Sequence, residues 1–379
     1  MKTGTSFFNK KIAAVALVYF SISGVLLYKY GIQLGGEAEK FIENASRIIN
    51  GQQLFNGIFG YFYIIYSLLV ALFIKLSVNL FFVVVVQIIL SFFAALCLYK
   101  LLKQVLDNSN ISFFFFIAYL LCYPIQKWNF FLYSESVHTS LLVIGIYYFN
   151  KWVTNKKHSS LVASVILLIL IFFSRPVGII FLASLFIVLM VWLYKNKKML
   201  QFYLLTAISI VSVTLILNSP FTAFVNPDSI RRMEIICMVP ENNENTVYKE
   251  YNREGLYKVF TVIKDEVGFD NFFRAGFKKL GCFFGMYRSY YSFRHNLLLI
   301  CFTLLYPFVL IGIFSKQSKT FYNTRLFSII YLLLTSFGIF FTCDEWSNRF
   351  VAPVFPFMLM LAAQGFLSVQ KKYNEKKLT

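Results

Sequence analysis

Ionisable side chains stand at the ends of hydrophobic runs that are far apart along the chain. They are Glu37 and Glu39 in GGEAEKF, Glu135 in SES, Arg175 in SRP and Arg349 in NRF. A carboxylate can accept a proton, and a guanidinium group binds an anion through two N–H donors. Such groups cost roughly 2.5–3.5 kcal/mol each inside a membrane, so they usually pair or line a wet cavity. We therefore expect a cavity that opens on one membrane face.

The hydrophobic runs that must position these groups dominate the chain. Of its 379 residues 58% are hydrophobic, and the mean hydropathy is +0.66. Several runs approach the roughly 20 apolar residues that cross a bilayer core. We expect an all-α membrane protein of about ten spans, near 11–30, 81–99, 111–131, 137–152, 159–174, 177–194, 200–218, 296–314, 326–342 and 350–367.

The distribution of charge fixes the expected topology. Alternate gaps between the runs hold 18 lysines and arginines but only two acids, Asp107 and Glu375. Because short cytoplasmic loops retain Lys and Arg, these gaps and both termini are predicted to be cytoplasmic. If residues 58–76 crossed the membrane fully, the lysine-rich gaps that follow would lie outside, against the positive-inside rule at five successive loops. We therefore predict that 58–76 is interfacial or re-entrant, after an amphipathic stretch at 37–57.

Three domains follow from this organisation. Residues 1–218 form a membrane catalytic module with a first external loop at 31–80, residues 219–295 form a small external subdomain, and residues 296–379 form C-terminal membrane helices with a basic cytoplasmic tail. The net charge of +19 is scattered over short loops and not gathered on one face, so it predicts contact with anionic membrane lipid and no nucleic acid.

Each candidate residue also has a purely structural interpretation. Glu37, Glu39 and Glu135 stand where an acid favours a helix N-terminus, and Arg175 precedes Pro176 at a span end, where arginine can extend to the headgroups. His138 is expected to pack or cap a helix rather than bind metal. The six cysteines show no metal-type spacing with the three histidines, but Cys237 and Cys282 fall in one external loop and could pair in an oxidising compartment.

The order of several short motifs resembles a known group of enzymes. Glu37 opens the first external loop, Phe41 follows, Asn50-Gly51-Gln52 ends a helical segment, and an aromatic stretch runs from Tyr61 to Tyr66. Ser134-Glu135-Ser136, Arg175-Pro176 and the RFVAPVFP segment that begins at Arg349 come later. This series resembles the GT-C superfamily of polyprenyl-phosphate-sugar-dependent glycosyltransferases. It is most similar to the bacterial branch related to protein mannosyltransferases and lipid A aminoarabinose transferases.

The resemblance implies roles for these residues. Arg175 and Arg349 would hold the lipid phosphate, and Glu37, or else Glu39, would act as the general base on the acceptor hydroxyl. Tyr61, Tyr66 and Glu135 would contact substrate, and Glu135 would orient it or hold a divalent cation. Two departures from the family pattern stand out: the first-loop acids are Glu37 and Glu39 where the family commonly has Asp, and Phe41 replaces a common Tyr.

The sequence therefore predicts an inverting glycosyltransferase of the bacterial cytoplasmic membrane. It would move a sugar from a polyprenyl-phosphate donor to a glycan, lipid or protein acceptor on the external face, with no certain cofactor beyond that possible divalent cation. Two alternatives remain open. A polysaccharide polymerase or ligase would not need a first-loop carboxylate before a re-entrant segment, and a secondary transporter should carry charges at mid-membrane and broken helices.

Overall fold

The structure, a computed structural model, describes residues 3–54, 57–207, 227–237, 255–288, 290–315, 319–343 and 348–378. Two compact units are present, each assembled from separate stretches of the chain. Unit 1 comprises residues 1–182, 304–328 and 355–379, and unit 2 comprises 183–303 and 329–354. The predicted three-domain division follows membrane sides and not compact units, and it stays a prediction.

The described residues are almost entirely helical, as predicted, and contain no strand beyond an isolated bridge between Gln33 and Phe131. Five helical segments among them are long and apolar enough to span a membrane, and a bent pair makes up to six. They are 10–30, 81–106, 178–195, 293–314 and 322–341, with 109–130 as the pair bent by 48°. The chain is thus a multi-pass membrane protein, while the predicted count of about ten is not confirmed.

The shortfall lies mainly in helices that are too short or too polar. The helix over 137–152 exists as α7 (Ser134–Asn155) but begins with polar residues, and α8 (His158–Phe172) has only 15 residues. At 1.5 Å per residue, 15 residues cover roughly 22 Å, less than the ~30 Å hydrocarbon core. The predicted span 200–218 is described only to residue 207, and the last helix, α17 (Phe355–Leu378), is diluted by its polar C-terminal turns.

Residues 31–80, predicted to be the first external loop and called so below, fold mainly as two short helices on unit 1. α1 (Thr3–Tyr30) leads into α2 (Ala38–Ile49), and the 3₁₀ helix η1 (Gly57–Tyr63) continues as α3 (Ile64–Lys75). α2 has one apolar face, from which Phe41 meets the Tyr66 ring of α3 edge-on at 4.8 Å. α3 has 12 residues, about 18 Å of helix, which is too short to cross. With the end of η1 it forms one short apolar helix, Gly60–Lys75, and the interfacial or re-entrant position of this segment stays a prediction.

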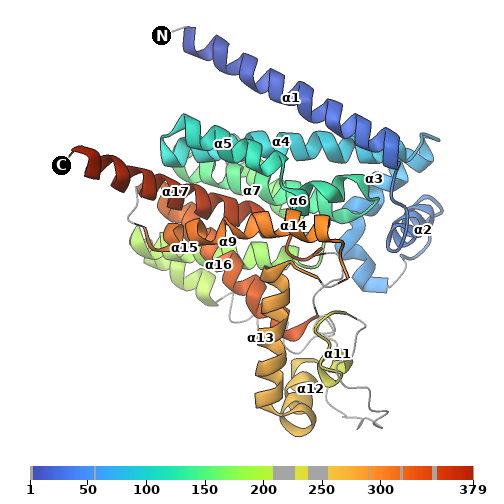
Figure 1. Ribbon diagram of the computed structural model, residues 1–379. Coiled ribbons are helices and arrows are strands. Elements are labelled where there is room, and N and C mark those ends of the chain that lie inside the picture. The colour runs from blue at the N-terminus through green and yellow to red at the C-terminus, as the bar shows by residue number, and fades with distance from the viewer. Residues whose placement is uncertain are drawn as a thin grey trace. The chain divides into compact units, whose positions relative to one another are not determined.

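The centre of unit 1 is a layer of helices that run side by side (Figure 1). α4 (Phe81–Leu106) packs against both α7 and α5 (Ser109–Leu120), and the chain bends after α5 into α6 (Tyr123–Gln126) and the 3₁₀ helix η2 (Lys127–Phe130). The Gln126 side chain donates to the Tyr119 carbonyl and so satisfies a backbone group beside the bend. The bend turns residues 126–133 toward the ends of α1 and α7.

Two glycines allow a backbone-to-backbone contact elsewhere in unit 1. α15 (Tyr306–Phe314) packs along α17, and a Cβ added at Gly312 would lie 2.0 Å from the Leu361 carbonyl oxygen. A Cβ at Gly365 would lie 1.9 Å from the Phe308 oxygen. Any side chain at either position would therefore force the two helices apart.

Unit 2 contains the described part of the predicted external subdomain. α11 (Pro227–Arg231), α12 (Gly255–Val262), the π-helix η4 (Ile263–Val267) and α13 (Phe269–Gly285) surround a small apolar cluster. The cluster includes Ile230, Val262 and Phe272 and is covered by Phe340 and Phe341 of α16 (Lys319–Phe341). Among the described residues there are also the helices α9 (Gly178–Lys195) and α14 (Phe293–Thr303).

A disulfide in unit 2 corrects one expectation. Cys237 is bonded to Cys343, 106 residues further along the chain, so the pairing with Cys282 that the sequence left open is not formed. Cys343 directly follows α16, and the Phe340 and Phe341 rings at the end of that helix pack on the cluster that holds Ile230. This packing brings residue 343 near the chain after α11, whereas Cys282 lies near the other end of α13.

Candidate functional site

A buried ion pair joins two of the predicted motifs in unit 1. Nη1 of Arg175 lies 2.5 Å from Oε1 of Glu135, and the two side chains are 3% and 0% exposed. Glu135 is in the first turn of α7, where an acid interacts favourably with the positive end of the helix. Removing two charges from water costs several kcal/mol of desolvation free energy for each, and only a well-made ion pair offsets this cost. The pair is therefore a costly feature between membrane helices.

The turn that carries Arg175 is tightly built. Pro176 disfavours helical geometry at Arg175, which is where α8 and α9 are separated. The Ser174 hydroxyl donates to the Ile171 carbonyl, and the Gly178 amide donates to the Arg175 carbonyl. A Cβ at Gly178 would lie 2.4 Å from the Ile171 oxygen, so the chain can close this tightly only with glycine there.

The first external loop reaches the same region through Tyr133. The Glu37 amide donates to the Tyr133 hydroxyl at 3.1 Å, and that hydroxyl donates to the Gly35 carbonyl at 2.7 Å. Gly36 between them has φ +67°, and a Cβ there would lie 2.5 Å from the same hydroxyl. Since Tyr133 is two residues before Glu135, the predicted first-loop acid is held beside the start of α7.

The other end of the loop contacts the Arg175 turn. The Ile65 amide at the start of α3 donates to the Phe173 carbonyl at 3.2 Å, and the Phe62 ring meets Phe172 edge-on. Three sequence-distant segments, the first external loop, the start of α7 and the turn at 173–178, are therefore in direct contact within unit 1. This is the convergence that the sequence predicted, for three of the segments.

The individual candidates differ in exposure. Glu37 is half-buried at the N-terminus of α2 and makes no side-chain cap to that helix, whereas Glu39 is exposed in the first turn of the helix. Tyr61 is half exposed. Tyr66 is fully buried, and its hydroxyl donates to Gln87 at 2.7 Å, so it packs between α3 and α4. Substrate contact by either tyrosine stays a prediction.

Arg349 belongs to unit 2 and is 4% exposed. Its neighbour Asn348 donates to the Met286 carbonyl, which fixes this segment to the end of α13. Asp344 and Glu345, which the sequence also places at this boundary, lie outside the described residues. Arg349 is thus a buried cation on the described part of unit 2, with its predicted phosphate role untested.

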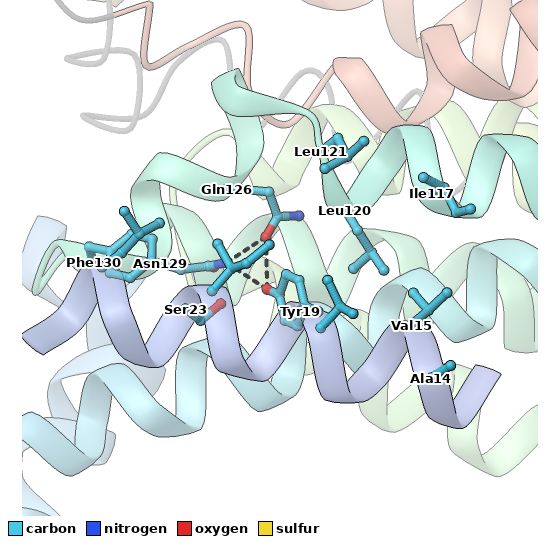
Figure 2. Close-up of a pocket in the computed structure, with 13 residues that line it drawn as sticks. Ala14, Val15, Tyr19, Ser23, Ile117, Leu120, Leu121, Gln126, Asn129 and Phe130 are labelled. Carbon is cyan, nitrogen blue, oxygen red and sulfur yellow. Dashed lines mark hydrogen bonds between the residues drawn. The ribbon is translucent and has the colours of Figure 1, made fainter. Parts of the chain in front are cut away.

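An apolar groove of about 430 Å³ lies on unit 1 between α1 and the bent helix α5–α6 (Figure 2). Its walls are aliphatic residues of both helices, such as Val15, Ile22 and Leu120. Its floor is polar: the Tyr19 hydroxyl donates to Gln126 at 2.8 Å, and the Asn129 amide donates to both. These groups satisfy one another, so the floor is a fixed neutral surface beneath an apolar channel.

The floor of the groove and the ion-pair region share one segment of chain. Ser136, next to Glu135, donates to Asn129 at 2.5 Å. Trp128 stacks on Tyr133 with ring centroids 5.9 Å apart, and Tyr133 holds the Glu37 amide. Residues 126–133 therefore face the groove at one end and the first-loop acid at the other.

The sequence pattern does not single out two of these contributors, Tyr133 and Ser174. His138, which was expected to pack or cap a helix, is fully buried. The available signal was proximity in sequence, because Tyr133 precedes Ser134-Glu135 and Ser174 precedes Arg175. Among the described residues no group of three His, Cys, Asp or Glu is arranged to hold a metal ion.

Comparison with known proteins gives a single result. No curated protein and no solved structure matches the chain. The profile of the Alg9-like mannosyltransferase family, a glycosyltransferase family of the GT-C type, matches residues 58–379, which includes α3, the Glu135–Arg175 pair and Arg349. The protein is accordingly a membrane glycosyltransferase, and it belongs to the Alg9-like mannosyltransferase family.

Proposed function

We propose that the chain transfers a sugar from a polyprenyl-phosphate donor to an envelope acceptor on the external face of a bacterial cytoplasmic membrane, with inversion at the anomeric carbon. The observation that carries this proposal is the contact of the first external loop, the start of α7 and the Arg175 turn in unit 1. It brings a half-buried carboxylate and a buried guanidinium to one end of a bundle of membrane helices.

Arg175 would bind the donor phosphate with the edge of the guanidinium that Glu135 does not hold. Its Nη1 faces Glu135, whereas its Nε makes no hydrogen bond to any described residue. Arginine presents its donors as a rigid fork, so fixing one edge orients the other. As the glycosyl–phosphate bond breaks, negative charge grows on the phosphate, and a preorganised cation stabilises the transition state more than the ground state. In this proposal Glu135 acts through Arg175, by holding one edge of its guanidinium group.

Glu37 is proposed as the general base and Glu39 as the second choice. The acceptor hydroxyl must lose its proton as its oxygen attacks the anomeric carbon, and a carboxylate within hydrogen-bond reach can take it. Glu37 is held by its own backbone beside Tyr133, whereas Glu39 is exposed. A fixed, partly shielded carboxylate is the better base because its position relative to the acceptor is defined.

The groove between α1 and α5–α6 is proposed to take the lipid chain. Its lining on α1 runs from Ala14 to Leu26, a length of roughly 18 Å at 1.5 Å per residue. The Leu26 end leads toward Tyr30 and Gln33, and Gln33 pairs with the backbone beside Phe131. A chain seated there would have its phosphate end toward residues 130–133, next to the first-loop acid.

A transfer assay with purified protein tests the proposed function. Polyprenyl-phosphate sugars, mannose first because of the family, are incubated with membrane lipid acceptors, and products are separated by thin-layer chromatography. Replacing Arg175 or Arg349 by Lys keeps the charge but removes the two-pronged contact, so donor use should weaken by about 1.5–3 kcal/mol for each contact. Unchanged activity in both Lys variants would contradict the phosphate role, and absence of any transfer by the wild type would contradict the function.

A further inference from the structure

His138 makes a buried contact to the Arg175 turn that the proposed chemistry has not used. The imidazole is fully buried, one turn after Glu135 on α7, and its Nδ1 lies 2.7 Å from the Ser174 hydroxyl oxygen. Ser174 directly precedes Arg175. The helix and the turn that carry the ion pair are therefore tied by a second contact, one helical turn after Glu135 and one residue before Arg175.

The hydrogen bonds assign the direction of this contact. The Ser174 hydroxyl has one proton, and it is donated to the Ile171 carbonyl at 2.8 Å, which can only accept. Ser174 must then accept from His138, so Nδ1 carries a proton and donates it. Nε2 is buried and makes no hydrogen bond to any described residue, so it takes no part in the contact.

The two contacts together close a ring. Residues three apart on a helix lie on one face, so Glu135 and His138 both point from α7 toward the turn. Glu135 holds Arg175 by its side chain, and His138 holds Ser174 close to the backbone. The ion pair alone holds only the end of the long arginine side chain, so the backbone of the turn could still shift. The histidine fixes the turn itself against α7, so the guanidinium has a defined starting point.

We propose that His138 is a positioning residue of the glycosyltransferase, which holds the turn at 173–178 so that Arg175 meets the donor phosphate. This inference rests on the proposed function and makes no use of contact between His138 and substrate. The alternative for a buried histidine, a metal ligand, has no support among the described residues, which contain no suitable group of ligands.

Two substitutions separate the ring nitrogens. His138→Asn places an amide N–H near the position of Nδ1, and His138→Gln places one near Nε2. We expect His138→Asn to keep donor use within a few-fold of wild type. His138→Gln and Ser174→Ala should raise the KM for donor about 10–100-fold, with a smaller change in kcat. The reason is that misplacing a binding group by about 1 Å lowers the rate by a factor of up to 10². The proposal would be overturned if His138→Gln kept donor use while His138→Asn lost it, or if His138→Gln had wild-type kinetics.

A double variant tests whether His138 acts through Arg175. On an Arg175→Lys background, His138→Gln should add little further loss, since the group that it positions has already changed. Losses that multiply would show that the two residues act independently and would contradict the inference. Thermal unfolding of each purified variant identifies those that fail to fold.

A measurement without catalysis separates this inference from the proposed function. Hydrogen exchange of the peptide covering 171–180 should be slowed equally in the wild type and His138→Asn and should be faster in His138→Gln and Ser174→Ala. If the wild type transfers no sugar but exchange behaves in this way, the proposed function is contradicted, whereas the proposal that His138 holds the turn at 173–178 is supported. Equal exchange rates in all four proteins would overturn the proposal that His138 holds this turn, whatever their transfer activity.

Discussion

The two units each contain an arginine bound by acids, in opposite surroundings. In unit 1, Arg175 and Glu135 are 3% and 0% exposed and connect a turn to a helix 40 residues away in sequence. In unit 2, Arg231 bonds Glu266 at 3.0 Å and Asp228 at 2.9 Å; Arg231 is itself only 7% exposed, but its acids reach water, at 18% and 55% exposed. The unit 2 cluster links α11 to η4 at the surface of a small apolar core.

This difference separates a structural ion pair from a functional candidate. A surface pair gains and costs little, so its presence needs no further explanation. A buried pair can often be replaced by apolar residues without loss of stability, so its retention in a membrane bundle asks for another reason. Phosphate binding by Arg175 supplies one. The comparison therefore favours the proposed chemistry in unit 1 and a structural role for the Arg231 cluster.

The largest expected effect is on turnover, in unit 1. Glu37→Gln keeps size and hydrogen bonding but cannot accept a proton, so turnover should fall roughly 10²–10⁴-fold while donor binding survives. The measurement is single-turnover transfer at saturating donor. Glu39→Gln is the matched control in the same helix, and Glu266→Gln is the control in unit 2; both should be milder. Loss confined to Glu39→Gln would move the role of base by two residues.

Stability should separate the two arginine sites next. Glu135→Gln leaves Arg175 buried without its counter-charge and should lower the free energy of unfolding by about 3–5 kcal/mol. Glu266→Gln should cost on the order of 1 kcal/mol. Denaturation in detergent compares them. The double variant Glu135→Leu with Arg175→Met should regain stability but not activity; regained activity would remove the functional argument for the pair.

The disulfide should matter to a similar or smaller degree, and only in unit 2. Replacing Cys237 and Cys343 together by Ser should cost about 2–4 kcal/mol, because the unfolded chain regains the freedom of a loop of 106 residues. Non-reducing peptide mapping should find the linked pair. A Cys237–Cys282 peptide, or no change in the melting temperature on reduction, would contradict the assignment.

The last expected effect is confined to one pH window and concerns unit 2. Burial lowers the pKa of Lys279 to about 8 from 10.5, against the attraction of Glu234, and Nζ donates to the Phe340 carbonyl at 3.3 Å. Between these values the folded chain has released the proton and the unfolded chain still holds it, so stability rises with pH from about 8 to 10.5. The difference in melting temperature between wild type and Lys279→Met should therefore depend on pH there. A constant difference would contradict this titration.

Helix content could be predicted because it depends on local pattern. The interfacial or re-entrant position of 58–76 rests on the lysine-rich gaps and stays a prediction, although the helix there, Gly60–Lys75, is short. The number of spans could not be predicted in this way, because a window of hydropathy does not report where a helix bends or starts. α7 begins at Ser134 with four polar residues among its first five, and α5 bends after Leu120.

The site was predictable in its charged members but not in the groups that hold them. Glu37, Glu135 and Arg175 stand out because a charge beside an apolar run has a high cost. Tyr133 and Ser174 have no such signature, since their role depends on a hydroxyl meeting a backbone amide or an imidazole from a distant segment. The partner of Cys237 was missed for the same reason, because packing of α16 decides it.

The contact between Gly312 and Gly365 has a consequence for the order of synthesis. α15 and α17 are separated by the whole of α16, and their backbones touch without intervening side chains. Domains usually form as their segments leave the ribosome, N-terminal first. Here α15 reaches the membrane before its partner has been translated, so unit 1 stays incomplete until the last 25 residues emerge. A ribosome that stalls within α16 would leave the face of α15 that carries Gly312 uncovered, and release of α17 is the step that completes unit 1.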